Sequence, residues 1–132
     1  MTAERKRRIL LVDDDRDFVQ STRDLLESEG YEVIAAHDGE SGLQTAIREK
    51  PDLMLLDVMM ATNTEGFEVS RKIPQTPELA RMPVIMVTGV RRALTLPFAF
   101  EPDDTWLPVS DILEKPVAPR ALLEAIRKRL GA

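Results

Sequence analysis

The sequence predicts an α/β domain built on a doubly wound, five-stranded parallel sheet. Five short aliphatic runs recur along the 132 residues, and several are apolar at successive positions, as strands covered on both faces require. Helical patterns separate most of these runs, and the alternation of strand and helix implies right-handed crossover connections. At this length we expect one domain, residues 1–132.

The expected strands are rich in β-branched and aliphatic side chains. Aromatic residues make up only 5% of the chain, so the core must consist mainly of aliphatic side chains and methionine. In chain order, the strands are predicted at Ile9–Val12, Tyr31–Ala35, Leu53–Leu56, Val84–Val87 and, more weakly, Asp111–Glu114.

The first two helices are expected from apolar residues that recur three or four positions apart. Gly30 ends the first helix, because glycine tolerates a positive φ, while Asp38 can cap the second and Pro51 follows its end. The expected buried faces are Phe18, Thr22, Leu25 and Leu26 in the first helix and Leu43, Ala46 and Ile47 in the second.

A third helix is predicted from about Glu65 to Ile73, because the prolines that follow prevent its continuation. The last helix starts near Pro119. Its apolar face is expected to hold Leu122, Leu123, Ile126 and Leu130. The stretch from Gly89 to Ser110 contains three prolines, so we expect an irregular or shortened fourth helix, formed in part over residues 91–96.

Composition excludes several classes of protein. Because the chain has no cysteine, it can have no disulfide, no thiolate zinc site and no cysteine nucleophile, and a cytoplasmic address is expected. Its apolar runs are too short to cross a bilayer, and no signal peptide is seen. The net charge of −5 argues against binding nucleic acid, although residues 1–7 form a basic amino-terminal arm. We expect no attached output domain.

Polar residues close the predicted strands, and ligands of open parallel sheets bind beyond the carboxyl ends of the strands. Asp13 and Asp14 follow the first strand, and Asp57 follows the third. If these two strands are neighbours, the three carboxylates share one pocket, where they repel one another unless a cation is present. Such an oxygen-rich site suits Mg²⁺, so the sequence predicts a magnesium site.

A carboxylate beside Mg²⁺ can act as a nucleophile toward phosphorus, and Asp57 is the candidate. Thr88 closes the fourth strand and Lys115 closes the fifth. The metal ion, the Thr88 hydroxyl and the Lys115 ammonium would supply one partner for each of the three equatorial oxygens of a transferred phosphoryl group.

Four motifs carry a resemblance to a known family. They are Leu10-Leu11-Val12-Asp13-Asp14-Asp15, Asp52-Leu53-Met54-Leu55-Leu56-Asp57-Val58-Met59-Met60, Val87-Thr88-Gly89 and Glu114-Lys115-Pro116. In this order the chain resembles the response-regulator receiver domains of two-component and phosphorelay systems. The resemblance implies a flavodoxin-like sheet of strand order 2-1-3-4-5. It also implies that Asp57 is phosphorylated from a phosphohistidine on a sensor histidine kinase or phosphotransfer protein.

The resemblance further implies the role of each site residue. Asp14 and Asp57 would hold Mg²⁺ directly, Asp13 mainly through water, and Met59 through its backbone carbonyl. Thr88 would bind the phosphoryl group and Lys115 would pair with it. The domain would signal to a downstream effector through protein contacts, and it would be no enzyme beyond accepting and losing its own phosphoryl group.

Three departures from the family pattern accompany the match. First, Ala61 stands where the family usually has proline, and one extra residue lies between Met60 and Gly66. Second, the segment between Thr88 and Lys115 is longer than usual. Third, Ile112 stands where the family usually has Tyr or Phe. The alternative is therefore a pseudo-receiver, which keeps the fold and signals without phosphorylation. A phosphatase with an aspartyl nucleophile is not expected, because it would need an Asp-x-Asp strand end together with a cap domain. A nucleotide or flavin binder is not expected either, because it would need a glycine-rich phosphate loop.

Two further residues near the predicted site are assigned no chemistry. Asp15 is expected to cap the first helix, because acidic residues at strand-to-helix turns commonly do so. His37, the single histidine, is expected to lie in a strand-to-helix loop without acting as a phosphodonor or a metal ligand.

Overall fold

The computed structural model describes residues 6–57, 69, 71–89, 111–115 and 117–130. The strands β1 (Arg8–Val12), β2 (Glu32–Ala36), β3 (Leu53–Asp57), β4 (Val84–Gly89) and β5 (Asp111–Lys115) form one sheet in the order β2-β1-β3-β4-β5. Every neighbouring pair is parallel. The predicted fold class and strand order are therefore confirmed.

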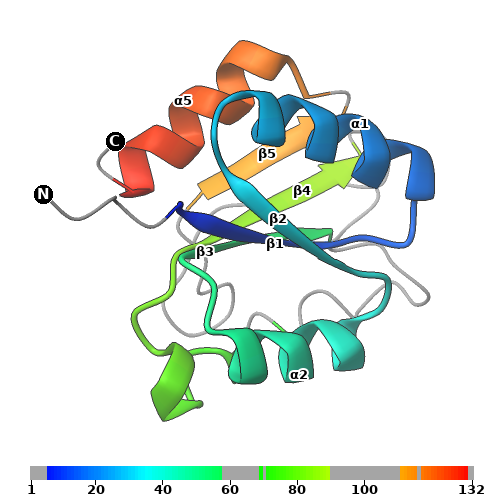
Figure 1. Ribbon diagram of the computed structural model, residues 1–132. Helices are drawn as coiled ribbons and strands as arrows, with labels where there is room; N and C mark the ends of the chain where they lie inside the picture. The colour runs from blue at the N-terminus through cyan, green and yellow to red at the C-terminus, as the bar shows by residue number, and fades with distance from the viewer. Residues whose placement is uncertain (1–5, 58–68, 70, 90–110, 116, 131–132) are drawn as a thin grey trace, which may run out of the picture.

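Helices cover both faces of this sheet (Figure 1). The helices α1 (Arg16–Ser28) and α5 (Pro119–Leu130) lie on one face. The helix α2 (Gly39–Glu49) and the short 3-10 helix η1 (Pro77–Leu79) lie on the other. Strand β1 begins and α5 ends on the same side of the molecule, away from the carboxyl ends of the strands.

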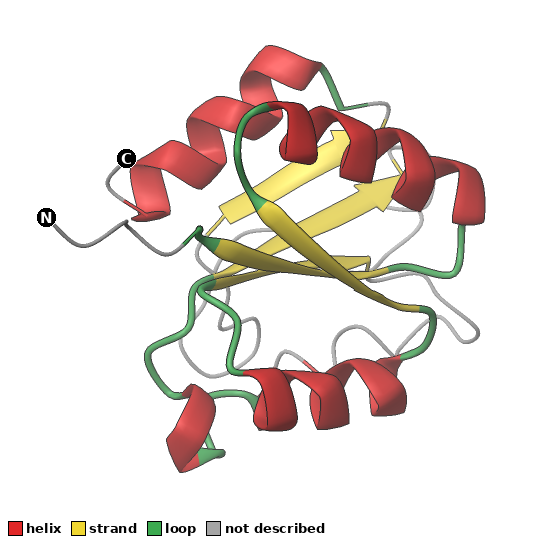
Figure 2. Cartoon of the chain, in the orientation of Figure 1, coloured by secondary structure: helices red, strands yellow, loops and turns green. Residues whose placement is uncertain are grey.

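The hydrophobic core has two layers, one beneath the helices on each face of the sheet. Figure 2 shows these helices on both faces. Side chains alternate between faces along a strand, so successive apolar residues serve both layers. On the face of α1 and α5 the strands β1 and β3 contribute Ile9, Leu11, Leu53 and Leu55, and on the face of α2 they contribute Leu10, Val12, Met54 and Leu56. This division explains why the strands read as unbroken apolar runs.

The strand predictions are correct to within one or two residues at each end. Tyr31 precedes β2, where it is buried against the α1 layer instead of pairing in the sheet. At the carboxyl ends β3 continues through Asp57, β4 through Gly89 and β5 through Lys115. The polar residues predicted to follow these strands therefore lie within them, because backbone pairing continues past the last apolar side chain.

The caps of the first two helices agree with the prediction. Gly30 follows α1 with a φ of +91°, in the region where glycine is favoured. The Asp38 carboxylate caps α2 by accepting a hydrogen bond of 2.8 Å from the Ser41 backbone N–H. Lys50 ends α2 in the left-handed conformation with a φ of 49°, which the sequence did not indicate.

The buried helix faces differ from the prediction by small rotations. In α1 the buried residues are Val19, Thr22 and Leu26, with Phe18 and Leu25 only partly buried. In α5 they are Leu122, Ala125 and Ile126, with Leu123 and Leu130 partly buried.

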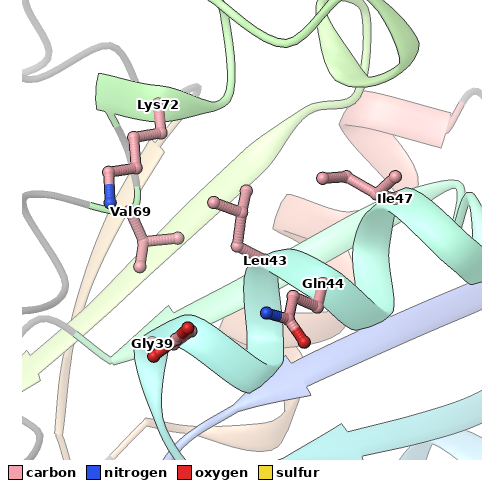
Figure 3. A pocket seen from close by; sticks show the side chains of 7 residues that line it. Gly39, Leu43, Gln44, Ile47, Val69 and Lys72 are labelled. Carbon is pink, nitrogen blue, oxygen red and sulfur yellow. The ribbon is translucent and has the colours of Figure 1, made fainter.

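The predicted buried stripe of α2 needs a larger correction. Gly42, Thr45 and Ala46 face the sheet, whereas Leu43 and Ile47 are only partly buried. Leu43 points toward Val69 across a surface hollow that Ile47 and Lys72 also line (Figure 3). Because the residues of α2 that face the sheet are small, the helix lies close to β1. Its larger apolar side chains are turned toward the surface hollow.

Several predicted features fall wholly or partly outside the described residues. Of the third helix, Val69, Arg71 and Lys72 are described and are helical. The altered loop after Met60, the predicted fourth helix and most of the basic arm lie outside. In the part of the chain that is described, no helix has the length and apolar character needed to cross a membrane.

Arg8, the first residue of β1, makes hydrogen bonds that connect four segments of the chain. Its backbone N–H donates to the Asp52 carboxylate at 2.8 Å, and its Nε donates to Glu32 at 2.9 Å. Its Nη1 and Nη2 donate to the backbone carbonyl and the carboxylate of Glu49, both at 2.6 Å. One arginine thus joins β1 to β2, to the end of α2 and to the turn before β3.

We expect Glu49→Gln to change how stability depends on pH. Hydrogen bonds from Arg8 and then from Arg48 lower the pKa of the Glu49 carboxyl below its ordinary value of 4.5. A carboxyl whose pKa is lowered in the folded state stabilises the fold above pH 4.5, and this contribution disappears as the pH falls through the folded pKa. Parent and variant should therefore differ in urea midpoint at neutral pH and converge in acid.

Glu124→Gln is the matched control for this experiment, because Glu124 is exposed on α5, whereas Arg8 bonds to acidic residues outside that helix. Its difference from the parent should be small at every pH. A Glu49→Gln difference that persists unchanged down to pH values well below 4.5 would contradict the assigned role of the Arg8–Glu49 ion pair.

Candidate functional site

Three carboxylates meet at the carboxyl ends of β1 and β3. Asp13 and Asp14 follow β1 directly, and Asp57 is the last residue of β3. One oxygen from each carboxylate lies within 4.8 Å of the others. Asp13 and Asp57 are buried, with exposed fractions of 2% and 5%, whereas Asp14 is exposed. The predicted meeting of these three residues is confirmed.

The pairing of β1 with β3 explains this meeting. Val12 lies opposite Leu56 in the parallel register, so Asp13 and Asp57 reach the same level of the sheet. Carboxylate charges that lie this close together repel one another, which is an electrostatic cost of holding them in one pocket. A bound divalent cation would remove this cost, and the set of carboxylate oxygens with one exposed member matches the preference of Mg²⁺ for oxygen ligands and retained water.

The chain after β1 is held by hydrogen bonds to two of its acidic residues. The Asp13 carboxylate accepts a hydrogen bond of 2.9 Å from the Asp15 backbone N–H. Asp15 caps α1 by accepting hydrogen bonds of 3.1 Å from the backbone N–H groups of Asp17 and Phe18. The prediction that Asp15 caps the first helix is therefore confirmed.

Thr88 and Lys115 are placed by their backbone in the two strands beyond β3. Val87 pairs with Asp57 across β3 and β4, so Thr88 is one residue past the level of Asp57. Lys115 ends β5 and pairs with Gly89. Both residues thus lie at the same carboxyl edge of the sheet as the acidic cluster. Met59, the fourth predicted metal ligand, lies outside the described residues.

His37 lies beside the cluster, which the sequence analysis did not predict. Its Nδ1 is 3.2 Å from the backbone carbonyl oxygen of Asp13. The strand order could have predicted this contact, because β2 pairs with β1 and Val12 lies opposite Ala36. The residues after these two, Asp13 and His37, must then be neighbours. Among the described residues, the group that could hold a metal ion consists of three aspartates and does not include His37.

Comparison with known proteins agrees with this architecture. The family model for the response regulator receiver domain matches residues 9–127. The transcriptional regulatory protein CpxR of Escherichia coli (strain K12) is 40% identical over 120 residues, covering 91% of this chain and 47% of CpxR. The chain therefore spans about half the length of that relative.

Two further relatives match along almost their whole length. Protein PilH of Pseudomonas aeruginosa is 34% identical over 127 residues, which are 94% of this chain and 98% of PilH. The structure of a CheY-like response regulator receiver domain protein from Methanospirillum hungatei JF-1 superposes with a TM-score of 0.77 at 34% identity, covering 96% of this chain and 95% of the other. From its fold, its cluster of strand-end carboxylates and these matches, the chain belongs to the response regulator receiver domain family.

Proposed function

We propose that this domain is a phosphoacceptor switch of a two-component or phosphorelay system, and that Asp57 accepts the phosphoryl group. The observation that carries the proposal is the meeting of Asp57 with Asp13 and Asp14 at one edge of the sheet. The family supports it, because receiver domains act in this kind of signalling. The proposed donor is a phosphohistidine on a sensor histidine kinase or phosphotransfer protein.

Magnesium is the proposed cofactor. Asp14 and Asp57 would hold the ion directly and Asp13 mainly through water, with the Met59 carbonyl as a further ligand. The carboxylate oxygens of the cluster, within 4.8 Å of one another, fit this role. When bound, Mg²⁺ would offset negative charge on the incoming phosphoryl group.

The proposed step is a displacement at phosphorus. A carboxylate oxygen of Asp57 forms a bond to phosphorus while the bond between phosphorus and the donor imidazole nitrogen breaks. The nitrogen keeps the bonding electron pair, and the imidazole is left neutral once it holds one proton. The products are an acyl phosphate on Asp57 and a free histidine on the donor.

Thr88 and Lys115 are proposed to stabilise the transferred group. The Thr88 hydroxyl would donate to one phosphoryl oxygen and the Lys115 ammonium would pair with another. Their positions at the ends of β4 and β5 support these roles. The phosphorylated domain would then signal by contacting a downstream protein in the cytoplasm, without binding nucleic acid or membrane.

The proposal predicts that an acyl phosphate phosphorylates the protein only with Mg²⁺, and that the reaction at limiting Mg²⁺ is faster with Asp14 in place. Intact-mass spectrometry should show one added phosphoryl group on the parent in millimolar Mg²⁺ and none in excess chelator. Asp14→Ala should slow the reaction at limiting Mg²⁺ by about tenfold or more, because it removes a direct ligand. Metal-free Asp14→Ala should be at least as stable as the parent, because one repelling charge is gone.

Asp24→Ala, an exposed acid on α1 outside the cluster, is the matched control and should react like the parent. If the parent gains no phosphoryl group from any acyl phosphate in Mg²⁺, the pseudo-receiver reading replaces this proposal. Equal rates for Asp14→Ala and the parent at limiting Mg²⁺ would show that the metal site is wrongly assigned.

A further inference from the structure

We propose that His37 is a positioning residue for the metal site, and that it holds the peptide between Asp13 and Asp14 so that the Asp14 carboxylate faces the ion. The role rests on the proposed function, because it concerns the site proposed to bind Mg²⁺. His37 itself would touch neither the ion nor the phosphoryl group.

The contact is directional. A carbonyl oxygen can only accept a hydrogen bond, so the His37 Nδ1 at 3.2 Å from the Asp13 carbonyl oxygen must carry the proton. The Asp13 backbone N–H donates in turn to the Ala36 carbonyl at 3.0 Å. The end of β2 therefore holds Asp13 through both its N–H and its carbonyl group, and His37 provides the second of these contacts.

This contact also controls the next residue. The carbonyl group of Asp13 and the N–H of Asp14 belong to one planar peptide unit, which rotates as a whole. Holding the carbonyl oxygen therefore fixes the direction in which the chain enters Asp14. Figure 1 shows β1 and β2 side by side. At the same edge of the sheet, β1 leads into α1 and β2 leads into α2.

Asp14 needs such a restraint more than its neighbours do. Asp57 is inside a strand and Asp13 is 2% exposed, so the sheet and the core place both of them. Asp14 is exposed, and mutual repulsion with the other two carboxylates would turn it toward solvent. A backbone fixed from β2 would keep the Asp14 carboxylate near the ion position before the ion arrives, which lowers the ordering cost of binding.

The test measures Mg²⁺ affinity in two variants at position 37. His37→Phe keeps a planar ring and removes the donor. His37→Asn restores a donor, because the amide nitrogen of Asn is bonded to Cγ just as Nδ1 is. Isothermal titration with MgCl₂ gives Kd, and thermal denaturation in chelator gives the stability of each metal-free protein. Physiological salt is used throughout to screen distant charges.

Loss of one restraining hydrogen bond should weaken Mg²⁺ binding by His37→Phe about fivefold, and His37→Asn should bind within about twofold of the parent. Asp38→Ala is the matched control. It removes the α2 cap contact to Ser41 in the same turn but leaves the Asp13 contact in place. It should lower the melting temperature and leave Kd unchanged.

Three outcomes would overturn the role of His37. Equal Kd values for His37→Phe and the parent would show that the contact does not position Asp14. Failure of His37→Asn to restore affinity would show that the donor is not the cause. A loss of affinity in Asp38→Ala as large as that in His37→Phe would show a general effect of loosening the turn. If the parent itself does not bind Mg²⁺, the proposed function fails first, and this role fails with it.

Discussion

Asp57→Asn is expected to abolish phosphoryl transfer to this domain, with a rate from acyl phosphate at least about 100-fold below the parent. The neutral amide oxygen of Asn is a far weaker nucleophile than a carboxylate oxygen, and Asp57 is the member of the acidic cluster that lies inside a buried strand. The shape of the side chain is nearly unchanged, so the fold should survive. Intact-mass spectrometry over time measures the loss.

Asp15→Asn is the matched control for this variant, since it makes the same substitution in the same acidic group of strand-end residues. Asp15 caps α1, and Asn is as good a cap as Asp, so the variant should be folded and should react at the rate of the parent. A phosphoryl group that still appears on Asp57→Asn at the parental rate would mean that another residue is the acceptor.

Gly42→Leu is expected to produce the largest loss of stability among these variants. A Cβ atom at Gly42 would lie 2.7 Å and 2.8 Å from the two methyl carbons of Val12, closer than such atoms approach in proteins. Val12 is fully buried in β1 and cannot move aside cheaply. Overpacking costs about 3 kcal/mol. The better helix propensity of Leu over Gly returns about 1 kcal/mol, so we expect a net loss of about 2 kcal/mol.

The change in the free energy of unfolding is measured by urea denaturation, with circular dichroism as the probe. Gln44→Leu is the matched control, because it introduces the same side chain at an exposed position of the same helix. Its stability should stay within about 0.5 kcal/mol of the parent. Val12 is bonded to Asp13, so Gly42→Leu should also weaken Mg²⁺ binding. Stability equal to that of the parent would mean that α2 can move away from β1 without cost.

The fold and the acidic cluster could be predicted because they depend on patterns that are local in the sequence. Unbroken apolar runs indicated strands buried on both faces, and Asp13, Asp14 and Asp57 each stood at the end of such a run. Their meeting required one more fact, the adjacency of the first and third strands. That adjacency came from the resemblance to receiver domains, since the runs alone do not order the strands.

The remaining features depend on contacts between side chains far apart in sequence. Arg8 meets Glu49 from 41 residues away, and no local pattern distinguishes it from the basic residues just before it. The close approach of Gly42 to Val12 turned α2 so that Leu43 and Ile47 became less buried than their spacing indicated. The contact of His37 with Asp13 could have been inferred from the register of β1 and β2, but only once their pairing was known.

The entry to β1 and the end of α5 lie together on the side away from the acidic cluster, which has a practical consequence for building reporters from this domain. A fluorescent protein attached on that side would stand at the opposite edge of the sheet from the carboxyl ends of the strands, where Asp57 lies. A donor protein could then approach the acceptor without collision. Such a fusion should keep the phosphorylation kinetics of the free domain.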